Sequence, residues 1–172
     1  TAGDMWIEEN LAIAWRRGKR RGLKWGVTKS ERQTYKELLA PFGLGLEDRL
    51  STKVSLLSGG QRQALTLLMA TVQKPDLLLL DEHTAALDPK TAAKVLSMTD
   101  ELIKEHGLTA IMITHNMKDA IKYGNRLIMM MDGKIIYDVS GEEKERLKVS
   151  DLLEKFETST GEEFANDRMM LI

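Results

Sequence analysis

The chain has 172 residues, of which 42% are hydrophobic and 30% charged, and its formal net charge is −1. This length and composition are those of one globular domain or slightly more, and they exclude a disordered chain. The sequence contains no cysteine, which excludes disulfides, thiolate metal sites and a cysteine nucleophile. No apolar run approaches the roughly 20 residues that a helix needs to cross a bilayer.

Charge is distributed unevenly along the chain. Residues 1–60 carry eleven Lys and Arg against seven Asp and Glu, whereas residues 61–172 carry fourteen against nineteen. Much of the basic excess lies between Arg16 and Lys24, where glycines interrupt the sequence. Such a cluster marks a nucleic-acid or membrane-surface patch in some proteins and a solvated helix end and loop in others. The close glycine spacing favours the loop.

The first third of the chain is predicted to be helical. Ile7, Leu11 and Ala14 recur at helical spacing, which predicts a helix over about residues 5–17. A later helix is predicted to begin at Ser58 and to run to about residue 73.

The helix between these two has two candidate N-caps. Either Thr28 or Ser30 can begin it, and Ser30 stands at capping-box spacing from Gln33. Proline and glycine at residues 41–43 predict its end.

The middle of the chain is predicted to contain strands as well as helices. Residues 76–81 form a run of leucines that ends in acids, which is typical of a buried parallel strand, and residues 108–114 form a second such strand. Between them, Pro89 predicts the first position of a helix that ends at His106 with Gly107 as its C-cap. This alternation of strand and helix, which continues to residue 131, predicts a parallel α/β sheet.

The last third is predicted to be shorter elements. Residues 116–123 should form a helix, and Asp132-Gly133 is a favoured two-residue turn for a hairpin of strands 126–131 and 134–138. Two further helices are predicted over residues 142–147 and 149–157, followed by a frayed tail.

Three short segments carry residues suited to phosphate chemistry. Leu57-Ser58-Gly59-Gly60-Gln61 offers free backbone N–H groups and a positive dipole at a helix start, which suits a phosphate, although an ordinary capped helix has the same pattern. Leu77–Glu82 delivers an Asp and a Glu at the carboxyl end of a strand, where they can hold Mg²⁺ and polarise water. Thr114-His115 ends the next strand, at the same edge of the predicted sheet.

In this order and spacing, the chain resembles the ATP-binding-cassette (ABC) ATPase family. Leu57–Gln61 is similar to the LSGGQ signature, Leu77–Glu82 to the Walker B segment, Ala85–Asp88 to the D-loop and His115 to the switch histidine. The resemblance implies an α/β fold: a partial P-loop NTPase core, with a parallel sheet and flanking helices, plus the ABC helical subdomain. Residues 1–72 would form the helical subdomain, and residues 73–172 the carboxyl-terminal half of the nucleotide-binding core.

The resemblance also implies roles for the strand-end residues. Asp81 would hold Mg²⁺, Glu82 would act as general base on the attacking water, and His115 would sense the γ-phosphate. The implied cofactors are therefore ATP and Mg²⁺.

The signature and D-loop residues would serve the partner subunit. Ser58 and Gly60 would contact the γ-phosphate across a dimer, Gly59 would give clearance, Gln61 would complete this nucleotide-binding segment, and Asp88 would communicate between the two sites. The implied partners are a second nucleotide-binding subunit and membrane-spanning transporter subunits, with no nucleic acid, at the cytoplasmic face of a membrane.

The sequence departs from the family pattern in two ways. His83 stands where the family usually has proline, which makes the turn after Glu82 less rigid. A Walker A loop, G-x-x-x-x-G-K-[ST], is absent, because neither Gly18-Lys19 nor Gly133-Lys134 is followed by Ser or Thr. The Q-loop glutamine and the adenine-stacking aromatic residue are also missing. We therefore expect the carboxyl-terminal portion of an ABC ATPase, inactive on its own.

Two alternatives remain open at this stage. A non-transport ABC ATPase acting on nucleic acid or ribosomes is supported only by the basic cluster between Arg16 and Lys24. A degenerate, non-hydrolysing regulatory protein would lack a Walker A loop altogether, but the intact LSGGQ segment and the Asp81-Glu82 pair argue against it.

Overall fold

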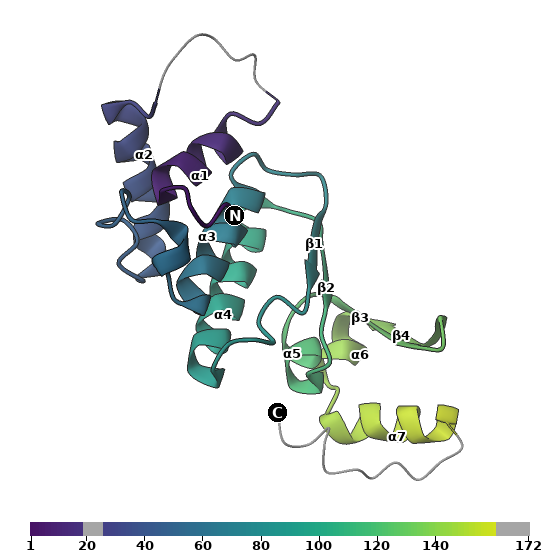
Figure 1. Ribbon diagram of the computed structural model, residues 1–172. Coiled ribbons are helices and arrows are strands. Elements are labelled where there is room, and N and C mark those ends of the chain that lie inside the picture. The colour runs from purple at the N-terminus through teal and green to yellow at the C-terminus, as the bar shows by residue number, and fades with distance from the viewer. Residues whose placement is uncertain (19–25, 161–172) are drawn as a thin grey trace. The chain divides into compact units, whose positions relative to one another are not determined.

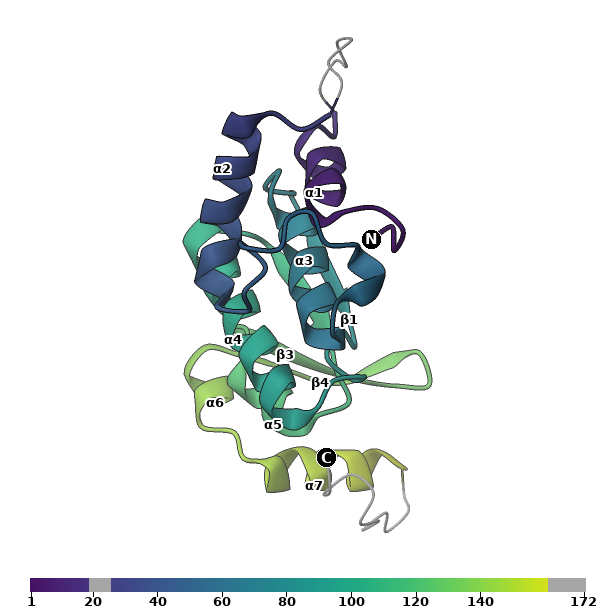
Figure 2. The ribbon, with the colours of Figure 1, turned by 60° about the vertical axis from the view of Figure 1, so that its left-hand side comes forward.

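The computed structural model describes residues 1–18 and 26–160, and these residues form two compact units that divide between Met112 and Ile113. Four residues of the basic cluster (Lys19, Arg20, Arg21 and Lys24) and the tail after residue 160 lie outside the described residues. The elements in chain order (Figures 1 and 2) are α1 (Ile7–Trp15), α2 (Lys29–Leu39), the short 3-10 helices η1 (Ala40–Phe42) and η2 (Val54–Leu56), α3 (Gly59–Thr71), β1 (Leu78–Asp81), α4 (Pro89–His106), β2 (Ala110–Ile113), α5 (Met117–Lys122), β3 (Arg126–Met131), β4 (Lys134–Ser140), α6 (Gly141–Glu145) and α7 (Val149–Thr160).

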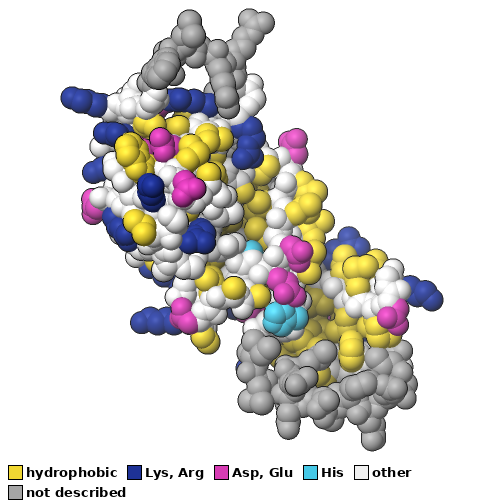
Figure 3. Space-filling model, in the orientation of Figure 1, with side chains coloured by type: hydrophobic (Ala, Val, Ile, Leu, Met, Phe, Trp, Pro, Cys, Tyr) yellow, Lys and Arg dark blue, Asp and Glu magenta, His cyan; other side chains and the backbone are white. Residues whose placement is uncertain are grey.

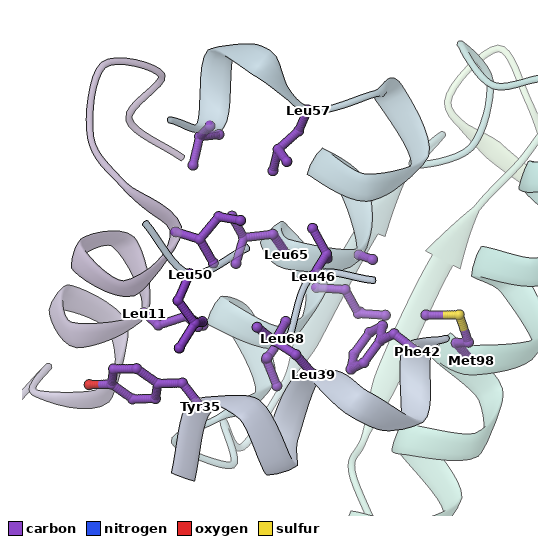
Figure 4. Close-up of a cluster of buried hydrophobic side chains, with 14 of the residues drawn as sticks. Leu11, Tyr35, Leu39, Phe42, Leu46, Leu50, Leu57, Leu65, Leu68 and Met98 are labelled. Carbon is purple, nitrogen blue, oxygen red and sulfur yellow. The ribbon is translucent and has the colours of Figure 1, made fainter. Parts of the chain in front are cut away.

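The helices of the first unit enclose one hydrophobic core. Ile7 and Leu11 of α1, Leu39 of α2 and Leu65 of α3 are all at most 1% exposed, and Figure 4 shows these helices directing apolar side chains toward one another. Tyr35 of α2 is buried in the same cluster, with its ring edge-on to that of Trp15 at a centroid distance of 6.3 Å. Burial of this apolar surface is the main force that holds the helices together.

The N-cap of α2 is Thr28, one of the two expected candidates. Its hydroxyl accepts a hydrogen bond from the backbone N–H of Glu31, and the Glu31 carboxylate accepts one from the Thr28 N–H at 2.8 Å. The predicted capping box of Ser30 and Gln33 is therefore wrong. The Arg16 guanidinium lies 2.7 Å from the Glu31 carboxylate, so a contact with α1 fixes the residue that completes the box.

The helix α4 has the ends that the sequence predicts. Asp88 is its N-cap, Pro89 occupies the first turn, and Gly107 ends it in the left-handed conformation with φ of 61°. Proline suits the first turn because the N–H that it lacks has no partner there, and glycine tolerates the left-handed C-cap.

The strands β1 and β2 lie side by side as parallel strands, as predicted. The N–H of Leu78 donates to the carbonyl of Thr109 at 2.9 Å at the start of the pair. Within the described ranges β3 belongs to a separate two-stranded sheet with β4, so the parallel sheet expected from the alternation to residue 131 is limited to β1 and β2. The pairing of β3 with β4 is the hairpin that the sequence predicts around Asp132-Gly133.

The side chains of β1 alternate between two environments. Leu78 and Leu80 are buried, whereas Leu79 is 67% exposed, and Ile111 of β2 is 53% exposed. In Figure 3, apolar side chains gather on the visible surface over this strand pair. Strands that are apolar on both faces are typical of parallel sheets covered on both sides.

The second unit is built on the hairpin of β3 and β4. Asp132 and Gly133 connect the strands with φ of 48° and 75°, as a primed two-residue turn requires, which confirms the predicted turn. Leu127, Val139 and Leu152 form its buried core, with partly buried side chains of α5 packed against them.

The described helices include none that has both the length and the apolar character of a membrane span. The subdomain boundary that we expect after residue 72 remains a prediction, since the first compact unit continues through α4 to Met112.

Candidate functional site

The signature segment forms the start of α3. Ser58 is the N-cap: its hydroxyl accepts a hydrogen bond from the Gln61 N–H at 3.3 Å, and the Gln61 side chain accepts one from the Ser58 N–H at 3.1 Å. The Gln61 amide also donates to the carbonyl of Leu44 at 3.0 Å. Gln61 therefore both closes the capping box and ties the start of the helix to the preceding loop.

The two signature glycines differ in their surroundings. Gly59 is exposed and Gly60 is buried. A Cβ on Gly59 would lie 3.1 Å from Leu87 Cδ2, and one on Gly60 would overlap the Thr91 side chain. The segment between β1 and α4 therefore lies directly against the start of α3, and absence of a side chain at Gly60 is what permits this approach.

The chain turns sharply where β1 ends. Asp81 is the last residue of the strand, and Glu82 follows with φ of 40°, a left-handed conformation that is uncommon for any residue but glycine. Both side chains are exposed. The Glu82 carbonyl accepts a hydrogen bond from the Ala85 N–H at 3.0 Å, which closes the turn. Two carboxylates are thus presented at the carboxyl end of a strand, as the sequence predicts.

Asp88 ends this connecting segment as the N-cap of α4. Its carboxylate accepts a hydrogen bond from the Thr91 N–H at 3.0 Å. Hydrogen bonds from the Thr91 side chain and backbone lower the pKa of Asp88. Asp88 therefore has a structural role within its own chain, in addition to any role at a partner.

His83 is half-buried directly after Glu82. Its Nε2 lies 3.4 Å from the Thr99 hydroxyl on α4, and burial lowers the pKa of the imidazole. Thr99 and Thr91, the two α4 residues that back this turn and the signature glycines, were not found by sequence reasoning. No local pattern marks them, since both contacts join segments that are distant in the chain.

His115 occupies an exposed position in a second structured turn, two residues after the end of β2. The N–H of Asn116 donates to the Thr114 hydroxyl at 3.1 Å, and the Asn116 side chain caps α5 by accepting from the N–H groups of Lys118 and Asp119. His115 thus lies between two hydrogen-bonded neighbours. It belongs to the second unit, so its expected proximity to Glu82 remains a prediction.

All the predicted site residues except His115 lie in the first unit, on two segments that contact each other. Asp81, Glu82 and Asp88 follow β1 in order, and the signature glycines pack against the end of that segment. No group of three or more His, Asp or Glu side chains within residues 1–18 and 26–160 is arranged to hold a metal ion alone. Mg²⁺ is commonly held by one or two carboxylates together with substrate phosphates and water, which suits Asp81.

Comparison with known proteins identifies relatives for this arrangement. The chain matches the family described as "ABC transporter" over residues 3–85. It is 46% identical over 157 residues to a tyrosine transport ATP-binding protein of Clostridioides difficile strain R20291, covering 91% of this chain and 62% of the relative.

Solved structures agree. The ADP conformation of an ATP-binding cassette of an ABC transporter superimposes with a TM-score of 0.70 at 28% identity, covering 94% of this chain and 65% of that one. A dimeric post-hydrolysis cassette bound to ADP and Pi gives 0.64 at 30% identity, with coverages of 80% and 57%. The chain thus spans less than two-thirds of the length of each of these proteins. Motifs, fold and relatives together support the assignment of this chain to the ATP-binding-cassette family.

Proposed function

We propose that the whole protein is the ATP-hydrolysing subunit of an ABC transporter and couples ATP hydrolysis to the movement of a solute across a membrane. The observation that carries this proposal is the Asp81-Glu82 pair, presented at the carboxyl end of β1 by a hydrogen-bonded turn. Ligands bind at this edge of open α/β sheets. The tyrosine transport relative supports a transport role.

The two carboxylates would have different roles in ATP hydrolysis. Asp81 would hold Mg²⁺, which neutralises phosphate charge when bound. Glu82 would accept a proton from the water that attacks the γ-phosphate, because an exposed carboxylate at this position can reach solvent. His115 would donate a hydrogen bond toward the same phosphate and sense its presence.

The signature segment would complete the ATP site of a second subunit. Ser58 and Gly59 are exposed at the start of α3, where the helix dipole favours an anion. Gly60 and Gln61 would hold this helix start in place through their contacts with Thr91 and Leu44. Asp88 would pass information between the two sites.

We infer the partners from the same relatives. A dimeric cassette structure supports pairing with a second nucleotide-binding subunit, and the transport relative supports membrane-spanning partners. Residues 1–72 would form the helical subdomain that touches those partners, and the protein would act at the cytoplasmic face of a membrane.

The nucleic-acid alternative gains no support from the described residues. This alternative was based on the basic cluster between Arg16 and Lys24. Within that cluster, the Arg16 guanidinium lies 2.7 Å from the Glu31 carboxylate. The pKa of Arg16 is raised, chiefly by its hydrogen bond to Glu31. When an arginine is paired with a carboxylate of its own chain, its positive charge is less available to bind a nucleic-acid phosphate.

The test is Glu82→Gln in the whole protein. The amide keeps the shape of the side chain but cannot accept a proton, so ATP binding should persist while turnover falls by about 10²–10⁴-fold. Glu105→Gln, the same change at an exposed position of α4, is the matched control and should leave turnover unchanged. Hydrolysis by Glu82→Gln at the parental rate would show that Glu82 is not the base.

A further inference from the structure

His83 stands next to the residue with the least usual backbone in the site. Glu82 has φ of 40°. A proline at position 83 would push residue 82 toward an extended conformation, because its ring crowds the backbone of the preceding residue. Histidine imposes no such restriction, and it therefore permits the left-handed conformation that Glu82 adopts.

The imidazole of His83 also provides an anchor. Its Nε2 lies 3.4 Å from Thr99 Oγ1, and Thr99 is only 3% exposed. The Thr99 hydroxyl donates its own hydrogen to the Val95 carbonyl at 2.8 Å, which leaves its lone pairs to accept from an Nε2–H group. Thr99 lies in the interior of an 18-residue helix, so the anchor point is rigid.

Two backbone hydrogen bonds shape the turn itself. The Ala85 N–H donates to the Glu82 carbonyl, and the Leu87 N–H donates to the Thr84 carbonyl at 3.1 Å. Asp88 ties the far end of the segment to the first turn of α4 through the Thr91 N–H. The contact between His83 and Thr99 ties the near end to α4, directly after Glu82.

We propose that His83 is a positioning residue for Glu82: its Nε2–H donates to Thr99 and holds the turn so that the Glu82 carboxylate faces the attacking water. This inference rests on the proposed function of Glu82 as general base. It predicts an effect on the chemical step rather than on nucleotide affinity, because the half-buried His83 side chain is directed to Thr99 on α4.

The experiment compares conservative and disruptive variants of both partners in the whole protein. His83→Leu and Thr99→Val each remove the hydrogen bond, whereas His83→Gln keeps an N–H donor and Thr99→Ser keeps the hydroxyl. The disruptive variants should each lower kcat by about two- to ten-fold, the range that one neutral hydrogen bond supplies, with the KM for ATP unchanged. His83→Gln and Thr99→Ser should recover most of the parental kcat.

The double variant His83→Leu/Thr99→Val decides whether the two residues act through one contact. Its kcat should fall no further than that of the lower single variant. Losses that multiply would refute the contact, and so would a change confined to KM or to thermal stability.

The Glu82→Gln variant separates this inference from the function on which it rests. If it retains parental turnover, the role of Glu82 is refuted. If it is inactive while His83→Leu and Thr99→Val retain parental kcat, only the positioning role of His83 is refuted.

Discussion

Gly60 and Thr91 are packed so closely that a Cβ on Gly60 would overlap the Cγ2 methyl of Thr91. The contact joins the signature segment to the first turn of α4, directly after the Asp88 cap. A glycine that the family resemblance connects with a phosphate therefore also has a packing role inside its own chain.

Replacement of Gly60 by alanine should destabilise the isolated chain. The added methyl forces the Thr91 side chain or α3 to shift, and overpacking of this kind costs about 1–3 kcal/mol in the free energy of unfolding. Urea denaturation measures the change.

Thr91→Ser is the matched compensating variant, because it removes the Cγ2 methyl and keeps the hydroxyl. Gly60→Ala/Thr91→Ser should recover most of the lost free energy. Gly59→Ala should cost less than Gly60→Ala, since its neighbour, Leu87 Cδ2 at 3.1 Å, is the end of a flexible side chain. Equal losses in both glycine variants, with no recovery by Thr91→Ser, would contradict the packing explanation.

Asp88 should stabilise α4 in a pH-dependent way. Its pKa is lowered by hydrogen bonds from Thr91. A lowered folded-state pKa means that this stabilisation is present above the unfolded-state pKa and is lost as the pH falls through the folded-state value. Asp88→Asn keeps a capping acceptor without the charge, so the parental chain should have the higher Tm at neutral pH.

The Tm difference between the parental chain and Asp88→Asn should then shrink toward zero in acid. Differential scanning calorimetry across the acid range measures it. A difference that does not change with pH would show that the Asp88 charge does not stabilise the helix.

Ionisation of Tyr35 should lower the stability of the folded chain at alkaline pH. Burial raises the pKa of Tyr35 to about 12, and the carboxylates of Glu31 and Glu8 act in the same direction. Because the folded-state pKa is above the usual value of about 10, the stabilisation is complete below pH ~10 and is lost as the pH rises through the folded-state value.

Tyr35→Phe removes this titration. The variant should lose less stability than the parental chain between pH ~10 and ~12, as measured by urea denaturation at each pH. Tyr137→Phe, at a partly buried ring in the second unit, is the control and should leave the Tyr35 titration in place. Parallel stability curves for the parental chain and Tyr35→Phe would refute the raised pKa.

The 172-residue chain alone should neither bind ATP tightly nor hydrolyse it. Its sequence has no Walker A loop to hold the β- and γ-phosphates. One exposed helix N-terminus contributes about 0.3–1 kcal/mol toward an anion, whereas micromolar affinity requires about 8 kcal/mol. Calorimetric titration with Mg-ATP should therefore give no micromolar binding, and a micromolar Kd with phosphate release would reveal a complete active site.

Much of the fold could be predicted from residues that favour helix ends and turns. Proline and glycine bound α4 as expected, and the turn at Asp132-Gly133 is confirmed. The capping residue of α2 was ambiguous, because Thr28 and Ser30 both suit an N-cap. A distant partner, Arg16, engages Glu31 and thereby favours the box that begins at Thr28. Sequence spacing contains no information about such a contact.

The site was predictable to the same extent. The motifs locate Asp81 and Glu82 at the carboxyl end of β1, where the structure has them. The left-handed backbone of Glu82 and its anchor through His83 to Thr99 were not predicted. Backbone strain and contacts between distant segments depend on how the completed fold packs. They therefore cannot be predicted from a single sequence.

The uncovered face of β1 has a consequence for handling the isolated chain. Leu77, Leu79 and Ile111 present apolar surface to water, and the net charge of −1 gives little mutual repulsion between molecules. Exposed apolar strands recruit further copies when charge does not keep them apart. Light scattering of the purified chain should therefore increase with concentration. Leu79→Lys should suppress this self-association while leaving the buried Leu78 and Leu80 contacts intact, which would make it a practical background for solution measurements.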